Sequence, residues 1–306
     1  MIAARWERRP EGLRRPALVA AFLGWNDAAG AASTAVALVG RRLRASRFAV
    51  IDDEELFDYG SVRPVIDLSR PGASAPIDWP KLELYEARTP GADRDLVLLV
   101  GPEPALRWRS FCSAVLTVLD ELGVELAVTL GALLADVAHA RPVRLTGMAS
   151  DEELLSGLGT RSPSYQGPTG IVGVLHQAAS EHGLAAVSLW APVPHYTANV
   201  VDPKGALALV RGLEAVVGVH VDASELEEAM VEHERRINRA VEADPGLQEM
   251  VRRLERAADE EPDIDPSSLF RTGEDLAGEL ERFLRQRELG LGGGEGDEEG
   301  GEPPTG

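Results

Sequence analysis

The sequence predicts an α/β protein: a three-layer domain with a mixed, largely parallel sheet, followed by a helical C-terminal appendage. Residues 96–100 (LVLLV) and 126–130 (LAVTL) are apolar runs of the kind that strands buried on both faces need. Between them, apolar residues recur with a period of 3.6, which indicates a helix that packs one face. Strand–helix–strand is the unit that builds parallel sheets with helices on their faces.

The segments before this unit add further layers. Residues 17–23 read as a first buried strand, and Asn26 or Asp27 can cap the helix that follows. Residues 48–51 are predicted to form a second strand. The stretch 53–90 carries several prolines and short alternating runs, which favours an antiparallel excursion at the edge of the sheet.

Glycines are expected to close the elements of the central part. Gly123 stands where a left-handed helix C-cap belongs, and we expect a turn at Gly131. A short third strand is predicted at residues 143–145, and a further strand at residues 186–189 that ends at Trp190.

Helices follow in the later part of the chain. Residues 150–159 should form a short helix, and residues 165–170 should open another. Asp202-Pro203 is a helix start, because proline is well tolerated in a first turn. Beyond it the chain becomes highly charged, with a narrow apolar stripe that Asp244-Pro245-Gly246 interrupts.

We therefore predict three regions. Residues 1–221 form the α/β domain, and residues 222–290 form an amphipathic helical extension. Residues 291–306 are an acidic, Gly-rich tail with nothing to bury, so we expect disorder there.

Composition argues against several classes of partner. The 306 residues carry 50 acidic and 31 basic side chains, a net charge of −19 that repels nucleic acid and anionic lipid. Arginines before the apolar run 17–23 resemble the start of a signal peptide, but the run is short for one. No apolar run in the sequence approaches the ~20 residues of a membrane span. We expect a cytoplasmic protein with no nucleic-acid or membrane partner. The one cysteine, Cys112, excludes an internal disulfide and reads as a buried apolar side chain.

Ligands of open α/β sheets bind in the loops at the carboxyl ends of the strands. The candidates here are residues 24–30, 101–104 and 131–141. A phosphate site needs free backbone N–H groups, but Pro102 and Pro104 have none, and no Gly-rich nucleotide motif is present. In addition, the carboxylates of Asp27 and Glu103 oppose an anion. These loops therefore disfavour a nucleotide.

Two pairs of residues raise the question of catalysis. Asp136 and His139 follow a strand and either form an acid–base pair or satisfy backbone groups of their loop. His195 beside Tyr196 has the same two interpretations. There is no G-x-S-x-G elbow and no H-x-x-x-H or Cys cluster, so we expect no metal and no cofactor. Three tryptophans near strand ends form either an apolar binding surface or local packing: Trp25, Trp108 and Trp190.

Five blocks of sequence, taken in order, resemble a known family. They are FLGWNDAAGAAS, LLVGPEPALRWRSF, LGALLADVAHARPVRLTGMAS, SYQGPTGIVGVL and SLWAPVPHYTANVVDPKGALALV. Together they resemble the actinobacterial branch of the proteasome assembly chaperone 2 (PAC2) family. The resemblance implies a fold like that of nucleoside phosphorylases and peptidyl-tRNA hydrolases, assembled as a homo-oligomer, with a trimer among the options. It also implies an interaction role, since eukaryotic and archaeal members bind proteasome α-subunits and guide ring assembly.

The resemblance selects the loops that we expect to contact a ligand or a partner. Their residues are Gly24, Asn26, Asp27, Gly101, Glu103, Trp108, Gly131, His139, Arg141, Tyr165, Gly167, Thr169, Trp190, His195 and Tyr196. Two departures stand out. The loop at 138–142 reads Ala-His-Ala-Arg-Pro where the family pattern is Pro-His-Thr-Arg-Pro, and residues 302–306 lack the hydrophobic–Tyr–any motif through which archaeal members dock.

Two hypotheses follow. The first is a non-catalytic, self-associating assembly chaperone, with proteasome subunits as one candidate partner. The alternative is a small-molecule enzyme of phosphorylase or hydrolase type, with Asp136, His139, Glu103 and Asn26 as its polar groups. An ATP-dependent carboligase, sometimes predicted for the family, is disfavoured because neither Lys81 nor Lys204 stands in an obvious phosphate loop.

Overall fold

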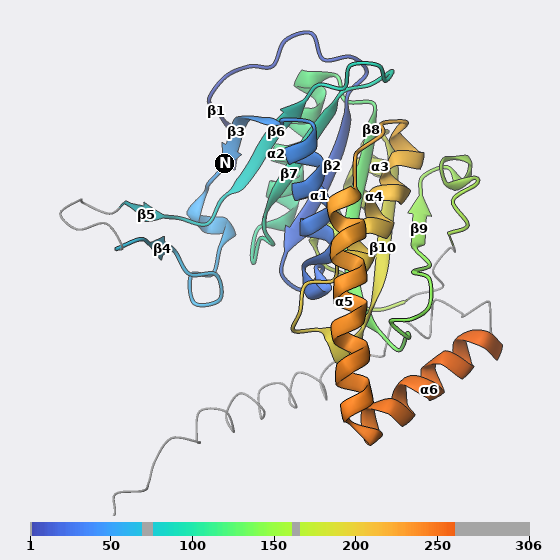
Figure 1. Ribbon diagram of the computed structural model, residues 1–306. Coiled ribbons are helices and arrows are strands. Elements are labelled where there is room, and N and C mark those ends of the chain that lie inside the picture. The colour runs from blue at the N-terminus through green and yellow to red at the C-terminus, as the bar shows by residue number, and fades with distance from the viewer. Residues whose placement is uncertain (1, 69–75, 161–165, 261–306) are drawn as a thin grey trace, which may run out of the picture.

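The computed structural model describes residues 2–68, 76–160 and 166–260. Its main element is an eight-stranded sheet in the order β1-β3-β6-β7-β2-β8-β10-β9 (Figure 1). In that order the strands are β1 (Arg5–Trp6), β3 (Ser46–Ile51), β6 (Leu82–Ala87), β7 (Leu96–Pro102), β2 (Ala17–Leu23), β8 (Leu126–Ala135), β10 (Ala185–Pro194) and β9 (Thr146–Ala149). The four strands β7, β2, β8 and β10 are parallel to one another. On one side β6, β3 and β1 follow with antiparallel pairing at each step, and on the other side β9 pairs antiparallel with β10. The mixed, largely parallel sheet is thus confirmed.

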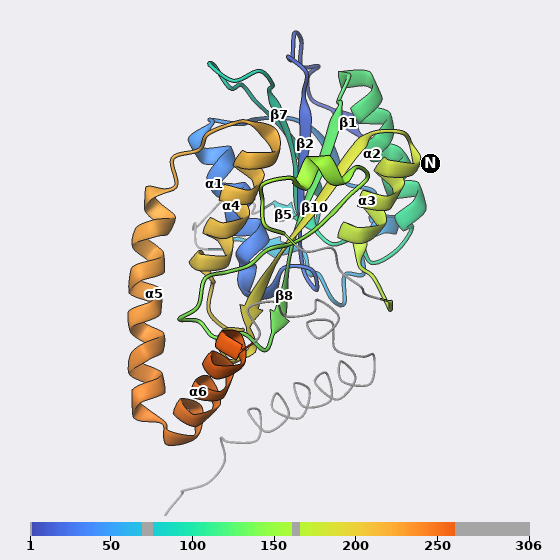
Figure 2. The same cartoon turned by 90° about the vertical axis from the view of Figure 1, so that its right-hand side faces the viewer.

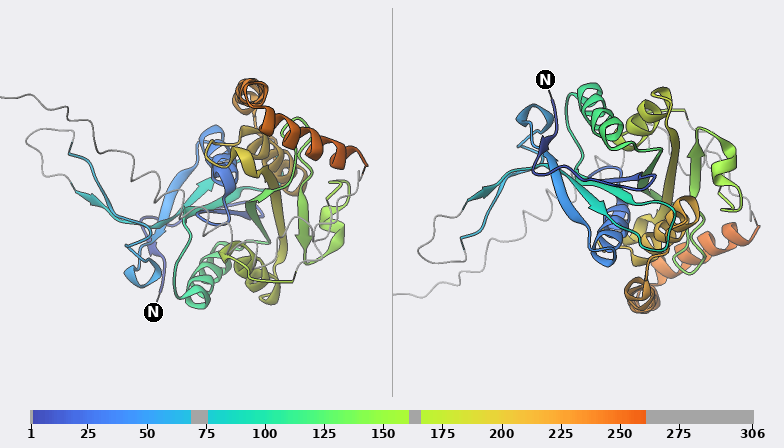
Figure 3. Two further views of the ribbon diagram at one scale, coloured as in Figure 1. Left: turned by 90° about the horizontal axis from the view of Figure 1, so that it is seen from below. Right: turned by 90° about the horizontal axis from the view of Figure 1, so that it is seen from above.

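Helices cover both faces of this sheet (Figure 3). One face carries α1 (Ala31–Arg42) and α4 (Pro203–Val217), and the other carries α2 (Trp108–Leu122) and α3 (Ile171–Glu181). Two apolar clusters result, one on each face, and β2 contributes alternate residues to both: Ala17, Val19 and Ala21 to the first, Leu18, Ala20 and Phe22 to the second. A strand buried on both faces explains the unbroken apolar run of the sequence.

The C-terminal part of the described chain is helical, as predicted. Helix α5 (Ser224–Ala243) packs on α4, and α6 (Pro245–Glu260) turns back towards the carboxyl ends of β8 and β10 (Figure 2). The break between them falls at Asp244, whose backbone is extended before Pro245. None of the helices among residues 2–260 that the structure describes is long and apolar enough to cross a membrane. The predicted tail at 291–306 and the rest of the extension after Glu260 lie outside the described residues.

Short elements complete the fold. A hairpin of β4 (Val65–Ile66) and β5 (Ile77–Asp78) projects from the body (Figure 1). Single 3₁₀ turns are η1 (Ala28–Gly30), η2 (Glu54–Leu56), η3 (Glu152–Leu155) and η4 (His195–Thr197). The antiparallel excursion within 53–90 is present, but β6 lies inside the sheet, between β3 and β7, and not at its edge.

Two predicted boundaries are wrong, and one contact explains both. We expected a turn at Gly131 and a strand end at Trp190, but β8 continues to Ala135 and β10 to Pro194. Gly131 and Trp190 are partners in the β8–β10 register, and a Cβ atom on Gly131 would lie 2.6 Å from the indole ring. The glycine is there because the indole packs against its backbone, not because the chain turns.

The prediction was also wrong further along the chain. The strand predicted at 143–145 is displaced to β9, and the helix predicted at 150–159 shortens to the single turn η3. Asp151 caps that turn by accepting a hydrogen bond from the N–H of Glu153 at 3.0 Å. Aspartate in this position competes with helix propagation by bonding its own neighbouring backbone.

Candidate functional site

Three loops at the carboxyl edge of the sheet converge on the carboxylate of Glu103. Its Oε1 accepts hydrogen bonds from the side-chain amide of Asn26 at 2.7 Å and from the N–H of Ile171, the first residue of α3, at 3.0 Å. Asn26 is 1% exposed. A Cβ atom on Gly170 would lie 2.3 Å from the Asn26 side-chain oxygen, so only glycine permits this approach. The loops after β2 and β7 are therefore joined to the start of α3.

The start of α1 has the same kind of anionic cap. Asp27 accepts hydrogen bonds from the N–H groups of Ala32 and Ser33, at 2.8 and 3.0 Å. Burial raises the pKa of Asp27, and the hydrogen bonds from Ser33 and Ala32 offset only part of that effect. The carboxylate of Asp27 therefore occupies two N–H groups that an anion at this loop would need.

Helix α4 repeats the arrangement, since Asp202 accepts the N–H of Lys204 at 3.0 Å. Three helices that begin at this edge, α1, α3 and α4, therefore have carboxylates of the chain itself at their N-termini. A helix N-terminus attracts phosphate through free N–H groups and the helix dipole. Here those attractions are already satisfied by Asp27, Glu103 and Asp202.

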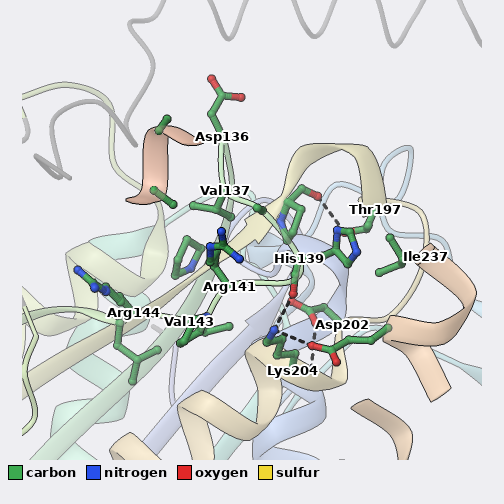
Figure 4. Close-up of a pocket in the computed structure, with 18 of the residues that line it drawn as sticks. Asp136, Val137, His139, Arg141, Val143, Arg144, Thr197, Asp202, Lys204 and Ile237 are labelled. Carbon is green, nitrogen blue, oxygen red and sulfur yellow. Dashed lines mark hydrogen bonds and ion pairs between the residues drawn. The ribbon is translucent and has the colours of Figure 1, made fainter. Parts of the chain in front are cut away.

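A cavity of about 460 Å³ lies at the same edge, covered by the C-terminal helices (Figure 4). Its wall combines the loop after β8, from Asp136 to Leu145, with the end of β10 and the start of α4. Helix α5 adds His233, Glu234 and Ile237, and the last turn of α6 closes the cavity.

His139 is fixed in this wall by hydrogen bonds to both of its ring nitrogens. Nε2 lies 2.9 Å from the side-chain oxygen of Asn238, so Nε2 carries the proton. Nδ1 then accepts from the hydroxyl of Tyr196 at 2.8 Å, and that hydroxyl accepts the N–H of His139 at 2.9 Å. Burial raises the pKa of Tyr196 to about 12, which keeps the hydroxyl available as a donor.

Of the two interpretations of Asp136 and His139, the acid–base pair is not the one that forms, because Tyr196 and Asn238 are the partners of the His139 ring nitrogens. Asp136 approaches His195 instead, with 3.1 Å between its Oδ1 and the ring Nδ1. Figure 4 shows the Asp136 carboxylate directed away from His139. The two histidines thus have different partners, and His139 links the loop after β8 to α5.

Two ion pairs hold the covering helices onto this loop. Lys204 donates from Nζ to the carbonyl oxygen of His139 at 2.6 Å and to Glu234 at 2.7 Å. Arg141 donates two hydrogen bonds to Asp259 of α6, at 3.0 and 2.6 Å. The roles of Lys204, Glu234 and Asp259 were not predicted.

Asn238 was missed as well, although one signal in the sequence points to it. Glu234 and Asn238 are four residues apart and therefore share one face of α5. The local sequence does not show, however, that His139 lies opposite that face.

Two of the other predicted site residues are glycines with positive φ, and two more are exposed ahead of α3. Gly24 and Gly101 take positive φ angles of 134° and 155°, and a Cβ on Gly101 would lie 2.5 Å from the carbonyl oxygen of Lys81. Gly167 and Thr169 are exposed ahead of α3, and Tyr165 lies outside the described residues.

The three tryptophans do not form one surface. Trp25 is 56% exposed, whereas Trp190 is 9% exposed and packs in the cluster on the α2–α3 face. Trp108 packs against the same cluster, and its indole N–H donates to the carbonyl oxygen of Pro104. Local packing therefore accounts for two of the three.

The geometry can be set beside known proteins. The model of the PAC2 family matches residues 21–241. The chain belongs to the PAC2 family. The match includes every loop of the candidate site within the described residues and continues into α5.

Solved structures agree with this assignment. The proteasome-assembly chaperone homologue of Mycobacterium tuberculosis is 42% identical, with a TM-score of 0.71 over 77% of this chain and 99% of that one. A PAC2 family protein of Streptomyces avermitilis is 45% identical, with a TM-score of 0.69 over 73% and 95% of the two chains. The archaeal proteasome activator of Pyrococcus furiosus, at 18% identity and a TM-score of 0.62 over 78% and 98%, shares the fold. No curated protein matches the chain.

Proposed function

We propose that this PAC2 protein is a non-catalytic assembly chaperone that binds folded protein subunits through the carboxyl edge of its sheet. The observation that supports the proposal most is a contrast at this edge: helix N–H groups are already hydrogen-bonded to carboxylates of the chain, whereas large apolar side chains are exposed. The carboxylates of Asp27, Glu103 and Asp202 accept N–H groups at the N-termini of α1, α3 and α4, where an anionic substrate would otherwise bind.

Large apolar side chains, in contrast, are exposed at the end of β2 and on the adjoining loops. Leu23 is 52% exposed, Trp25 56%, Leu106 57% and Val201 56%. Leu23 pairs in register with Pro102 of β7, close in sequence to Leu106, and Val201 lies beside Gly30 of the loop after β2. Tryptophan and leucine exposed together are typical of a surface that another protein covers.

The relatives indicate the kind of subunit. The Mycobacterium tuberculosis relative is described as a proteasome-assembly chaperone homologue, and the Pyrococcus furiosus protein of the same fold as a proteasome activator. We therefore propose proteasome subunits as partners. We also propose that the protein acts in the cytoplasm as a homo-oligomer.

The test uses purified full-length chain and separately purified proteasome α- and β-subunits of Mycobacterium tuberculosis. Native mass spectrometry should detect a complex with α-subunits, and the chain should change the rate at which half-proteasomes appear. Trp25→Glu should weaken the complex at least tenfold, because a buried tryptophan at an interface centre is worth about 2 kcal/mol or more.

Val231→Glu is the matched control. Val231 is 44% exposed on α5, away from the loops that carry the apolar side chains, so its replacement should leave the complex unchanged. A chain that binds neither subunit, or that binds equally well with Glu at position 25, would contradict the proposal.

A further inference from the structure

The cavity beneath α6 has an apolar lining and polar groups that no side chain of the described residues pairs with. Its volume of about 460 Å³ is in the range of small-molecule sites. Much of its lining is apolar, with Val143 and Leu145 on one side, Pro192 at the end of β10 and Ile237 on α5. An apolar lining of this size can bury the body of an organic molecule.

Arg144 supplies an unneutralised positive charge at this cavity. The other charged side chains of the wall pair with one another, with His195 or with a backbone N–H, as described above. Arg144 is exposed and has no hydrogen bond or ion pair with any residue that the structure describes. Figure 4 shows it on the side of the cavity opposite Lys204 and Asp202.

His233 adds an unused hydrogen-bonding group. This residue of α5 lines the cavity, is 4% exposed, and has a buried Nδ1 without a partner among the described residues. Desolvation lowers the pKa of His233 more than the nearby Asp202 raises it, which favours the neutral ring. A buried polar group without a partner is costly, and a bound molecule would remove that cost.

We propose that this cavity binds a small organic acid, whose apolar body lies between Val143 and Ile237 and whose carboxylate pairs with Arg144. A carboxylate suits the guanidinium because two parallel N–H···O bonds match its planar shape. A doubly charged phosphate is less suitable, since Asp136, Glu234 and other carboxylates also line the wall. The proposal is independent of the chaperone role, because its test needs only the purified chain.

Three probes share an eight-carbon chain and differ in the head group: octanoate, octanol and octylamine, each used below its micelle concentration. They separate the contribution of the carboxylate from that of the apolar chain. Calorimetry with the full-length chain should show octanoate binding at least tenfold more tightly than the other two. Arg144→Gln should weaken octanoate binding about tenfold or more, the usual effect of removing a charged hydrogen-bond donor. Arg109→Gln, on an exposed arginine of α2 outside the cavity, is the matched control and should have no effect.

A second measurement locates the site. Octanoate should slow hydrogen exchange in α6 and in residues 137–145, and Ile237→Trp, which fills the cavity, should abolish binding of all three probes. Absence of octanoate binding, equal affinity of wild-type and Arg144→Gln chains, or protection confined to other segments would overturn the proposal. If Arg144→Gln fails to fold, the relative affinities of the wild-type chain for octanoate, octanol and octylamine still test the proposal.

Discussion

Replacing Glu103 tests whether its carboxylate holds the carboxyl-edge loops together. Glu103→Ala removes two hydrogen bonds to a charged acceptor, from Asn26 at 2.7 Å and from Ile171 at 3.0 Å, and leaves the buried Asn26 amide unpaired. Such bonds are worth about 1.5–3 kcal/mol each, and the loss of charge at a helix N-terminus adds about 0.3–1 kcal/mol. Because one oxygen accepts both bonds, we expect a loss of about 3 kcal/mol for alanine and about 1–2 kcal/mol for glutamine.

Urea unfolding and thermal melts measure this loss. For a chain of this size the alanine variant should melt about 6–12 °C lower, at 2–4 °C per kcal/mol. Glu125→Gln is the matched control, since it removes the carboxylate of an exposed ion pair. The side chain of Glu125 is 48% exposed, and that of its partner Arg15 is 59% exposed. Exposed pairs contribute about 0–1 kcal/mol. If the alanine variant at 103 is as stable as that control, Glu103 does not join the loops.

The same variant tests the self-capping of α3. Without the carboxylate, the N–H of Ile171 is open to an added anion. Sulfate should therefore raise the melting temperature of Glu103→Ala by more than it raises that of the wild-type chain. An identical increase in both would show that sulfate acts only through its general exclusion from protein surfaces.

Three further predictions concern the rest of the fold. Gly131→Val should destabilise the protein by about 1–3 kcal/mol in urea unfolding, because the new side chain meets the Trp190 indole at 2.6 Å; unchanged stability would mean that the indole moves at no cost. Burial alone would raise the pKa of Asp95, but hydrogen bonds from Arg14 and from nearby backbone outweigh it and lower the pKa. The stability that Asp95 supplies is therefore full above about pH 4 and declines as the pH falls below that value, a decline that unfolding curves of Asp95→Asn should lack. Burial raises the pKa of Cys112 to about 11, so a thiol reagent should label it only in denaturant, and rapid labelling of the native chain would contradict its buried position.

Local signals were enough to predict much of this fold. The apolar run at 17–23 predicted β2, Gly123 predicted the end of α2 with a φ of 66°, and Asp202 predicted the start of α4. Each depends on residues within one turn or one strand, where propensity and capping act.

Contacts between distant segments explain what was missed. Gly131 was predicted as a turn because the side chain that requires a glycine there, the Trp190 indole, lies on another strand and cannot be recognised from the local sequence. For His139 the sequence offered only nearby groups, Asp136 or the loop backbone, whereas its partner Asn238 lies on α5, 99 residues further along the chain. The self-capping by Glu103 likewise needs the position of α3, which no local pattern contains.

The central place of β2 has a consequence for how the chain is made. Ala17–Leu23 leave the ribosome well before the two strands that flank them, β7 at Leu96–Pro102 and β8 at Leu126–Ala135. Until then an apolar segment has two unpaired edges, which is a condition that favours aggregation. Sheets built from such distant pairs also form slowly. The nascent chain therefore passes through a long interval in which β2 has no partner strand.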